Sequence, residues 1–276
     1  MGGSVPRCDK RAIVLLHVAC LLFHLSGAFT ALYFGWGKDL GLQLYVVKLK
    51  WVEGSDEMYS FELQTSDLRA PMDIMTAAFF GLSALQHFVW VALAVAGWLL
   101  PTVEKFMETY FWEELFSGHC WWRWVEYSLS ATVMLVQIAL LVGMREVYQL
   151  QLLAGLSFTT MLCGWLTEVW AVYNPKSSYA LRMLPHLLGW LPYISAWAAI
   201  LAHFFSYDSV PAFVVAIVVG CAVSFTSFAF VQIHFQRYIN DYYKTEYAYC
   251  LLSLASKGYL GGFVLSNVIL SSTGTT

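Results

Sequence analysis

The sequence predicts an all-α membrane protein, a seven-transmembrane-helix bundle with a short extracellular β-ribbon in its first loop. Of the 276 residues, 59% are hydrophobic and only 12% are charged, and the mean hydropathy is +0.61. A soluble domain carries roughly 25% charged residues, so the composition excludes that class. Seven stretches are long enough to cross a bilayer core about 30 Å thick, at about 1.5 Å per helical residue.

The apolar stretches follow one another without a change of composition, so we predict a single domain over residues 1–276. The predicted spans are residues 12–34, 72–100, 121–143, 147–172, 184–206, 210–237 and 246–270. The N-terminal region lacks a short apolar stretch followed by a small-residue cleavage site. We therefore expect the first span to be a retained helix and not a removed signal peptide.

The positive charges of the loops predict the orientation. If the spans alternate, the side that holds the N-terminus carries nine basic residues: Arg7, Lys10, Arg11, Lys105, Arg123, Lys176, Arg182, Arg237 and Lys244. The other side carries five: Lys38, Lys48, Lys50, Arg69 and Arg145. Since cytoplasmic loops are enriched in Lys and Arg, we predict a cytoplasmic N-terminus and an extracellular C-terminus.

The long first loop has the pattern of a β-hairpin. Residues 42–52 and 58–65 alternate between apolar and polar side chains, and the turn-forming residues 53–57 lie between them. Because a two-stranded ribbon is marginal alone, we expect it to pack on the bundle or on a second copy of the chain.

Residues 103–117 mix aromatic and acidic side chains at helical spacing. Two interpretations remain open for this segment, an amphipathic helix at the cytoplasmic membrane surface and a packed loop.

The last span contains one basic residue, Lys257, and the third span contains one acidic residue, Glu126. An unpaired ammonium at a helix centre costs roughly 2.5 to 3.5 kcal/mol on insertion scales, so Lys257 is expected to be paired or covalently used. A buried lysine amine condenses with an aldehyde to a Schiff base. Once the Schiff base is protonated, it is a buried cation and needs a fixed anion. The alternative is a structural ion pair within the membrane.

Counting residues from the cytoplasmic ends of the spans places His24 and His87 within one to two helical turns of Lys257 and Glu126. Ser253 and Lys257 share a helix face at spacing i, i+4, and Arg123 lies one turn from Glu126. The imidazoles would accept or relay a proton. The alternative is that these residues are only structural: the histidines would pack and hydrogen-bond within the bundle, and Ser253 would bond to a carbonyl of its own helix. Glu168 lies near a cytoplasmic span end, and we interpret it as an interfacial, structural carboxylate.

Other chemistries find little support in the sequence. None of the six cysteines has a CxxC or other ligand spacing, so we predict neither a disulfide framework nor a metal site. The net charge of −3 and the absence of a long basic run do not favour nucleic-acid binding. No hydrolase nucleophile or phosphate-binding loop is recognisable, and we do not expect an enzyme.

Six of the seven spans contain motifs that resemble those of the heliorhodopsins. The matching segments are Phe23-His24-Leu, Gly81-Leu-Ser-Ala-Leu-Gln-His87-Phe, Arg123-Trp-Val-Glu126-Tyr-Ser-Leu-Ser, Gly164-Trp-Leu-Thr-Glu168, Ser227-Phe-Ala-Phe-Val-Gln232 and Leu252-Ser253-Leu-Ala-Ser-Lys257. They occur in order and cover most of the chain. The Arg-Trp-Val-Glu-Tyr-Ser segment is highly specific.

This resemblance implies retinal on Lys257, all-trans in the dark and 13-cis after light, with Glu126 as counterion. It places Ser253 beside the Schiff base and His24 and His87 in a cytoplasmic-side polar cavity, and we assign Ser130 and Arg123 to the same neighbourhood. The pocket walls predicted from position in the spans are Met134, Trp165, Tyr193, Trp197 and Phe228. The resemblance also implies an inside N-terminus and a homodimer in the bilayer, whose first extracellular loop is a β-ribbon.

We therefore predict a light-sensing photoreceptor that signals by a conformational change, through an unidentified cytoplasmic partner. Three features differ from the family pattern: the long aromatic loop ending at His119, Gln137 in the third span and His234 in the sixth. Added polar groups of this kind favour the first alternative, light-driven or light-gated proton or ion transport. The second alternative is a retinal-free membrane protein that uses Lys257 and Glu126 as an ion pair.

Overall fold

Seven long helices form the body of the protein in the computed structural model, which describes residues 10–51, 59–237 and 242–273. They are α1 (Lys10–Gly35), α2 (Met72–Leu99), α5 (Trp121–Leu141), α6 (Val147–Tyr173), α8 (Leu184–Phe204), α9 (Ala212–Arg237) and α10 (Lys244–Val264). Each is long and apolar enough to cross a membrane, α10 together with its π-helical continuation η3 (Leu265–Ile269). The ends of these helices lie within a few residues of the ends of the predicted spans.

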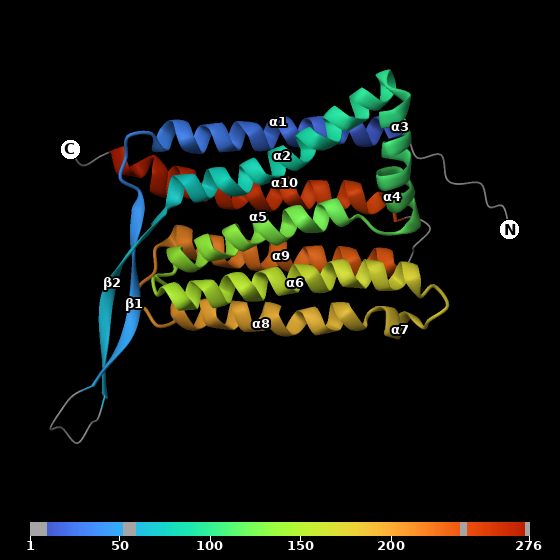
Figure 1. The fold of residues 1–276 in the computed structure, drawn as a ribbon. Helices are drawn as coiled ribbons and strands as arrows, with labels where there is room; N and C mark the ends of the chain where they lie inside the picture. Colours follow the sequence, from blue (N-terminus) through green and yellow to red (C-terminus); the bar gives the residue numbers. More distant parts are fainter. Residues whose placement is uncertain (1–9, 52–58, 238–241, 274–276) are drawn as a thin grey trace.

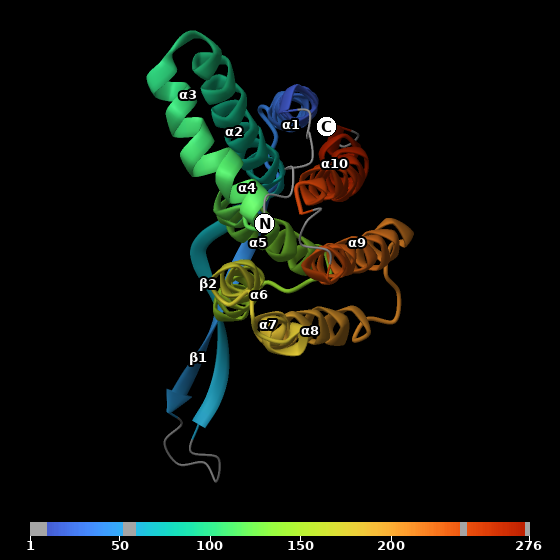
Figure 2. The same ribbon diagram turned by 90° about the vertical axis from the view of Figure 1, so that its right-hand side faces the viewer.

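The seven helices run along one axis (Figure 1) and follow one another around the bundle in chain order, with α10 returning beside α1 (Figure 2). Alternation places the starts of α1, α5, α8 and α10 at one end. The short helices α7 (Tyr179–Arg182) and η4 (Ser271–Thr273) lie in a connection and after the last span.

A helical arm connects α2 to α5 and consists of α3 (Pro101–Met107), the π-helical turn η1 (Glu108–Trp112) and α4 (Glu113–Ser117). Pro101 begins α3 at the first helical position, where its missing N–H costs nothing. Gly118, at φ 110°, ends α4 in the left-handed conformation that favours glycine. The segment 103–117 is thus helical. We call the end of the bundle that carries the arm the arm end.

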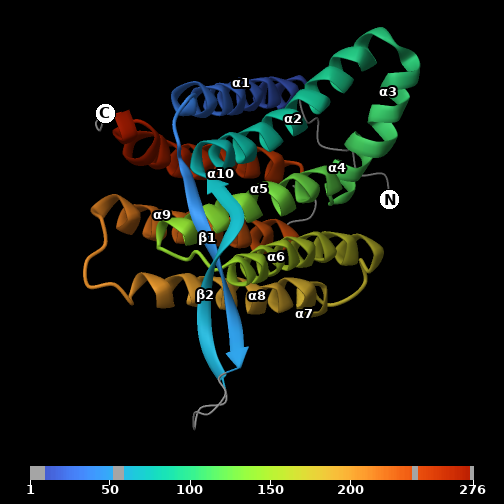
Figure 3. The same ribbon diagram turned by 60° about the vertical axis from the view of Figure 1, so that its left-hand side comes forward.

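At the opposite end, the ribbon end, β1 (Gly41–Trp51) and β2 (Tyr59–Pro71) form an antiparallel two-stranded sheet that projects beyond the bundle (Figure 3). The ribbon is longer than the predicted 42–65 because β2 continues to pair down to Gly41↔Pro71, past a register shift between Gln43 and Tyr45. The predicted turn at 53–57 lies outside the described residues. Tyr45 N–H donates to Arg145 O at 2.9 Å, which ties the ribbon to the bundle.

Two apolar clusters occupy the two ends of the bundle. One, near the ribbon end, includes Phe79, Ile138 and Leu260, and the other, near the arm end, includes Ile13 and Trp90. Between them lie Glu126 of α5, which is between Cys120 and Met134 in the sequence, and Lys257 of α10, which is between Tyr247 and Leu260. The functional site is therefore a polar layer enclosed by two apolar cores.

Helices α8 and α9 meet through polar side chains. The Tyr193 and Thr226 hydroxyls lie 2.7 Å apart, and His186 Nδ1 lies 2.7 Å from Gln232 Oε1. These contacts hold the two helices beside the cavity described below.

Candidate functional site

Lys257 of α10 and Glu126 of α5 meet inside the bundle. Lys257 Nζ lies 3.1 Å from Glu126 Oε1 and 3.0 Å from Ser253 Oγ, and both charged residues are buried. The i, i+4 spacing that put Ser253 on the face of Lys257 is thus realised as a hydrogen bond. A buried ion pair needs such additional bonds, because desolvation offsets much of the attraction between the charges.

A residue that we did not single out completes this centre. Ser83 of α2 donates its hydroxyl to Glu126 Oε1 at 2.5 Å. Ser83 lies four residues before His87, so both side chains share one helix face. This spacing was a signal that could have identified Ser83 from the sequence. Glu126 is therefore held from α2 and from α10.

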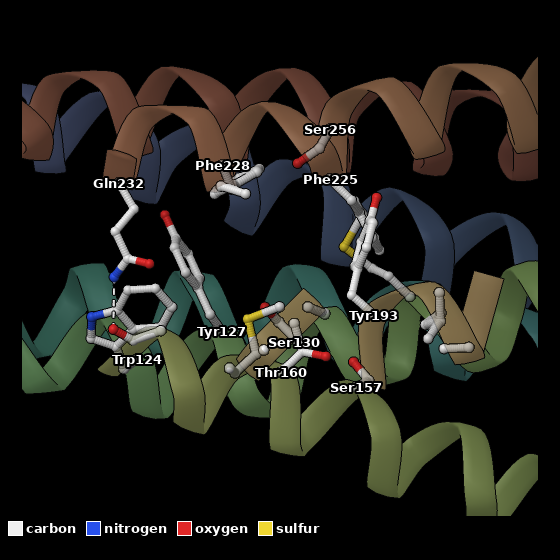
Figure 4. Close-up of a pocket in the computed structure, with 18 of the residues that line it drawn as sticks. Trp124, Tyr127, Ser130, Ser157, Thr160, Tyr193, Phe225, Phe228, Gln232 and Ser256 are labelled. Atoms are coloured by element: carbon white, nitrogen blue, oxygen red, sulfur yellow. Dashed lines mark hydrogen bonds between the residues drawn. The ribbon is translucent and has the colours of Figure 1, made fainter. Parts of the chain in front are cut away.

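A cavity of about 100 Å³ begins at Lys257 and extends between α5, α6, α8 and α9. Its walls are mainly apolar and aromatic, and Figure 4 shows the rings of Tyr127, Tyr193, Phe225 and Phe228 directed toward it. Lys257 Nζ also lies 5.3 Å from the centre of the Tyr127 ring, a cation–π distance. A closely packed core does not leave this much space.

Four of the five pocket walls that we predicted line this cavity, namely Met134, Tyr193, Trp197 and Phe228, and so does Ser130. Trp165 does not line it, and 36% of its surface is exposed. Its neighbour Gly164 takes the inward position, where an added Cβ would lie 2.3 Å from the Trp124 ring. Successive residues of a helix point about 100° apart. Our prediction placed the inward-facing position one residue too late, at Trp165 in place of Gly164.

The two predicted histidines lie together on α1 and α2. The rings of His24 and His87 stack with centroids 5.5 Å apart and planes at 2°, and both side chains are buried. His87 also lines a second, smaller cavity, whose other walls include Glu126, Ser253, Arg123 and Glu246. The structure therefore brings Glu126 and His87 to one polar space on the arm side of Lys257.

Arg123 pairs away from Glu126. Its Nη1 lies 2.7 Å from Glu246 Oε2, and its Nη2 lies 3.1 Å from Glu168 Oε1 and 2.6 Å from the Tyr242 hydroxyl. Glu168 is fully buried, which corrects its interpretation as an interfacial carboxylate. Spacing along one helix placed Arg123 near Glu126, but its partners come from α6, α10 and the segment before α10.

Two further buried residues belong to this layer, and sequence reasoning missed both. His17 was not distinguished from the other histidines, and Glu246 was treated only as the start of the last span. His17 Nδ1 lies 2.7 Å from His87 Nδ1, and His17 Nε2 lies 3.4 Å from Glu246 Oε1. His17 is seven residues before His24, about two helical turns, so its position on the same face was a signal.

Comparison with known proteins agrees with this architecture. The model of the heliorhodopsin family matches residues 15–269. Seven chains of solved structures match, among them the crystal structure of thermophilic rhodopsin from Rubrobacter xylanophilus. That match has a TM-score of 0.63 at 14% identity and covers 96% of this chain and 100% of the other, so it shows the fold alone. No curated protein sequence gives a significant match.

The fold defines the class, a membrane protein of the rhodopsin type with seven membrane-spanning helices. Within that class, the chain belongs to the heliorhodopsin family, which consists of retinal-binding rhodopsins.

Proposed function

We propose that this protein is a light-sensing photoreceptor in which Lys257 carries retinal and Glu126 is the counterion. The observation that carries the proposal is the buried Lys257–Glu126 pair at 3.1 Å, in which Lys257 also lines a mainly apolar cavity. A structural ion pair alone would not need that cavity.

The residues present fit retinal. Lys257 supplies the amine, and the aromatic walls from Tyr127 to Phe228 suit an apolar polyene. When bound, retinal supplies visible absorption and a light-driven isomerisation, which we propose runs from all-trans to 13-cis. The tight contact of Gly164 with the Trp124 ring gives the wall a fixed shape on the α6 side.

The chain's own residues would control one proton. Glu126 and Ser253 hold a proton at Lys257 Nζ through contacts of 3.1 and 3.0 Å. If Nζ turns away from Glu126, it loses the negative charge that stabilises this proton, and the proton leaves. Relaxation of the helices around the altered pair would then be the signal, on the slower timescale of collective helix motion.

The distribution of polar groups favours a sensor over a transporter. Buried polar residues extend from Lys257 toward the arm end, through His87 to Arg123. Toward the ribbon end, Leu260 and Val264 follow Lys257 on α10, and Met134 and Ile138 of α5 belong to the same apolar cluster. A proton could thus be stored on one side of Lys257 while an apolar plug separates it from the other side. Light-driven or light-gated proton or ion transport remains the alternative, because Gln137 bonds to Thr76 within that plug at 2.8 Å.

We further propose that the arm end faces the cytoplasm, as the loop charges indicate, and presents the signal to a cytoplasmic partner. We also propose a homodimer that uses the ribbon. In support, Val47, Leu49, Phe61 and Leu63 form two cross-strand pairs on one ribbon face and are all exposed. Exposed apolar faces of this kind are typical of interaction surfaces.

The test is a flash-induced current from voltage-clamped cells that express the chain with all-trans retinal, together with its visible spectrum. Lys257→Ala removes the amine, and Lys48→Ala, at an exposed position of the ribbon, is the control. Colour that depends on Lys257, without current, supports the sensor. A Lys257-dependent current would transfer the proposal to transport, and colour retained in Lys257→Ala would contradict both.

A further inference from the structure

Beyond the proposed photoreceptor, the layer on the arm side of Lys257 contains two groups that have no role in holding a chromophore, His17 and Glu246. Both are buried, at 0% and 2% exposure. They lie on α1 and α10, and the small cavity that borders Glu126 has Glu246 and His87 in its wall. A buried carboxylate and imidazole at this place call for a physical reason.

The charges of this cluster do not balance. Arg123 contributes one positive charge, and its partners Glu168 and Glu246 contribute two negative charges, so the formal charge is −1 when His17 is neutral. An excess negative charge in a low-dielectric interior is costly, and one added proton removes it. The cluster therefore has the capacity to accept one proton.

Glu246 is better placed than Glu168 to receive that proton. Both oxygens of Glu168 accept hydrogen bonds, Oε1 from Arg123 Nη2 and Oε2 from the Cys120 N–H, each at 3.1 Å. Glu246 uses only Oε2 for Arg123, and its Oε1 faces His17 Nε2 at 3.4 Å. A proton from His17 would satisfy Oε1 without breaking the bond to Arg123.

His17 lies between His87 and Glu246, in position to receive a proton from the first and pass one to the second. Its Nδ1 faces His87 Nδ1 at 2.7 Å, and its Nε2 faces Glu246 at 3.4 Å. An imidazole can take up a proton on one nitrogen and release another from the second. The ring is held in this position by stacking on Trp90, with centroids 4.3 Å apart and planes at 14°. Cys250 Sγ also lies within 4.8 Å of a ring nitrogen of His17 and of His87.

We propose that His17 and Glu246 form the terminal proton-accepting pair of this protein, with His87 as the relay. The inference rests on the proposed function, because it requires a proton at Lys257 Nζ. That proton leaves as H⁺, and the N–H bonding electrons stay on the nitrogen. The proton moves past Glu126 and through the small polar cavity to His87. His87 then gives a proton to His17 Nδ1. His17 releases its Nε2 proton to Glu246 Oε1, so Glu246 becomes neutral and the charge of −1 moves to Glu126.

The consequence is a stored proton that neutralises Glu246 and weakens its bond to Arg123. Arg123 joins α5, α6 and α10 through Glu168 and Glu246. Proton arrival would therefore loosen the contact between α5 and α10 at the arm end. This gives the proposed photoreceptor a defined place at which a proton movement becomes a helix movement.

The experiment uses the full chain with retinal in lipid nanodiscs, excited by a flash. Near-ultraviolet absorbance follows the time during which Lys257 Nζ lacks its proton, and infrared difference spectra follow the C=O stretch of protonated carboxyl groups. Glu246→Gln and His17→Asn are the test variants. The matched controls are Glu114→Gln and His119→Asn, because Glu114 and His119 form a second histidine–glutamate pair at the arm end, at 3.9 Å.

We expect a carboxyl C=O band that rises as Nζ loses its proton, disappears in Glu246→Gln and persists in Glu114→Gln. In His17→Asn the proton would stay near Glu126 and return faster, by about tenfold for a barrier lowered by about 1.4 kcal/mol, whereas His119→Asn would stay within about twofold of the unmodified chain. A band that persists in Glu246→Gln, or a His17→Asn rate equal to the control rate, overturns the proposal.

Two further outcomes distinguish a failure of the proposed photoreceptor function from a failure of the proposed His17–Glu246 pair. A colourless unmodified chain refutes the proposed function itself, whereas a coloured chain that loses its Nζ proton without any carboxyl band refutes only the terminal pair. If His17→Asn and Glu246→Gln do not fold, Glu246→Asp keeps a carboxyl group and should shift the band in frequency. An unshifted band in that variant also overturns the proposal.

Discussion

Lys257 Nζ and Glu126 Oε1 lie 3.1 Å apart across the interface of α10 and α5, and both side chains are buried. The same carboxylate oxygen accepts the Ser83 hydroxyl at 2.5 Å. Glu126 is thus held in place independently of Lys257. A carboxylate fixed in this way can stabilise a positive charge without reorganising, which is the property a counterion needs.

The first prediction concerns this charge. Glu126→Gln keeps the shape of the side chain and an acceptor for Ser83 but removes the negative charge beside Nζ. We expect the visible absorption maximum of the retinal-loaded chain to move to longer wavelength, because the positive charge is less confined to the nitrogen. Visible spectroscopy measures this shift, and an unchanged spectrum would remove Glu126 from the counterion role.

Stability gives an independent measure of the same pair. Loss of one partner leaves Lys257 unpaired and should cost about 3 to 5 kcal/mol. The control is Glu62→Gln, since Glu62 and Lys50 form an exposed pair at 3.9 Å and exposed pairs contribute about 0.2 to 1 kcal/mol. A lower midpoint of thermal unfolding is expected only for Glu126→Gln.

The second prediction concerns the pocket wall. In Gly164→Ala, the new Cβ would meet the Trp124 ring at 2.3 Å, so the ring must move into the cavity. Overpacking of this kind typically costs 1 to 3 kcal/mol, and we expect weaker retinal uptake and a shifted absorption maximum. Gly155→Ala on the same helix is the control, because its Cβ would have no neighbour within 4 Å. Equal retinal uptake by the two variants would show that the Gly164 contact does not shape the pocket.

The third prediction concerns the buried arginine. Arg123→Gln leaves Glu168 and Glu246 without their cation, and we expect a loss of about 3 to 5 kcal/mol in unfolding free energy. Asp39→Asn breaks the exposed pair of Asp39 with Arg69 and should leave the midpoint nearly unchanged, because exposed ion pairs contribute little. Thermal unfolding followed by circular dichroism compares the two variants, and similar midpoints would argue against a structural role for the Arg123 cluster.

Most of the fold was predictable because each span is a long apolar stretch between polar loops. The end of the ribbon was not, since alternation weakens after residue 65. Residues 69–71 pair with 41–43 beyond a register shift, and the Arg69 side chain reaches across the ribbon, where its Nη2 donates to Gly41 O at 2.5 Å. Local pattern could not reveal that contact.

The site residues were predictable where a charged side chain, which is rare in a membrane span, occurs within one. Lys257 and Glu126 are conspicuous because a charge inside a bilayer needs a partner. The partners of Arg123 were not predictable, because the rotation of each helix decides which side chains meet. Glu246 was not recognised for a related reason. It lies in the first turn of α10, where a carboxylate is expected at the membrane interface, yet it is buried and its partners come from α1 and α5.

The last prediction concerns the ribbon. Leu49 and Phe61 are directly paired across the strands and are 59% and 75% exposed, so they lie at the centre of the apolar ribbon face. If this face is the dimer contact, Leu49→Lys with Phe61→Lys should place like charges in it and weaken association, because each dimer would bury four unpaired ammonium groups. Light scattering of the solubilised chain coupled to size-exclusion chromatography reports the mass of the protein part. Gln64→Lys is the matched control, since residue 64 has the opposite strand parity and its added charge points away from the apolar face. A double variant with the same mass as the unmodified chain and the control would place any dimer contact elsewhere, and a monomeric unmodified chain would exclude the dimer.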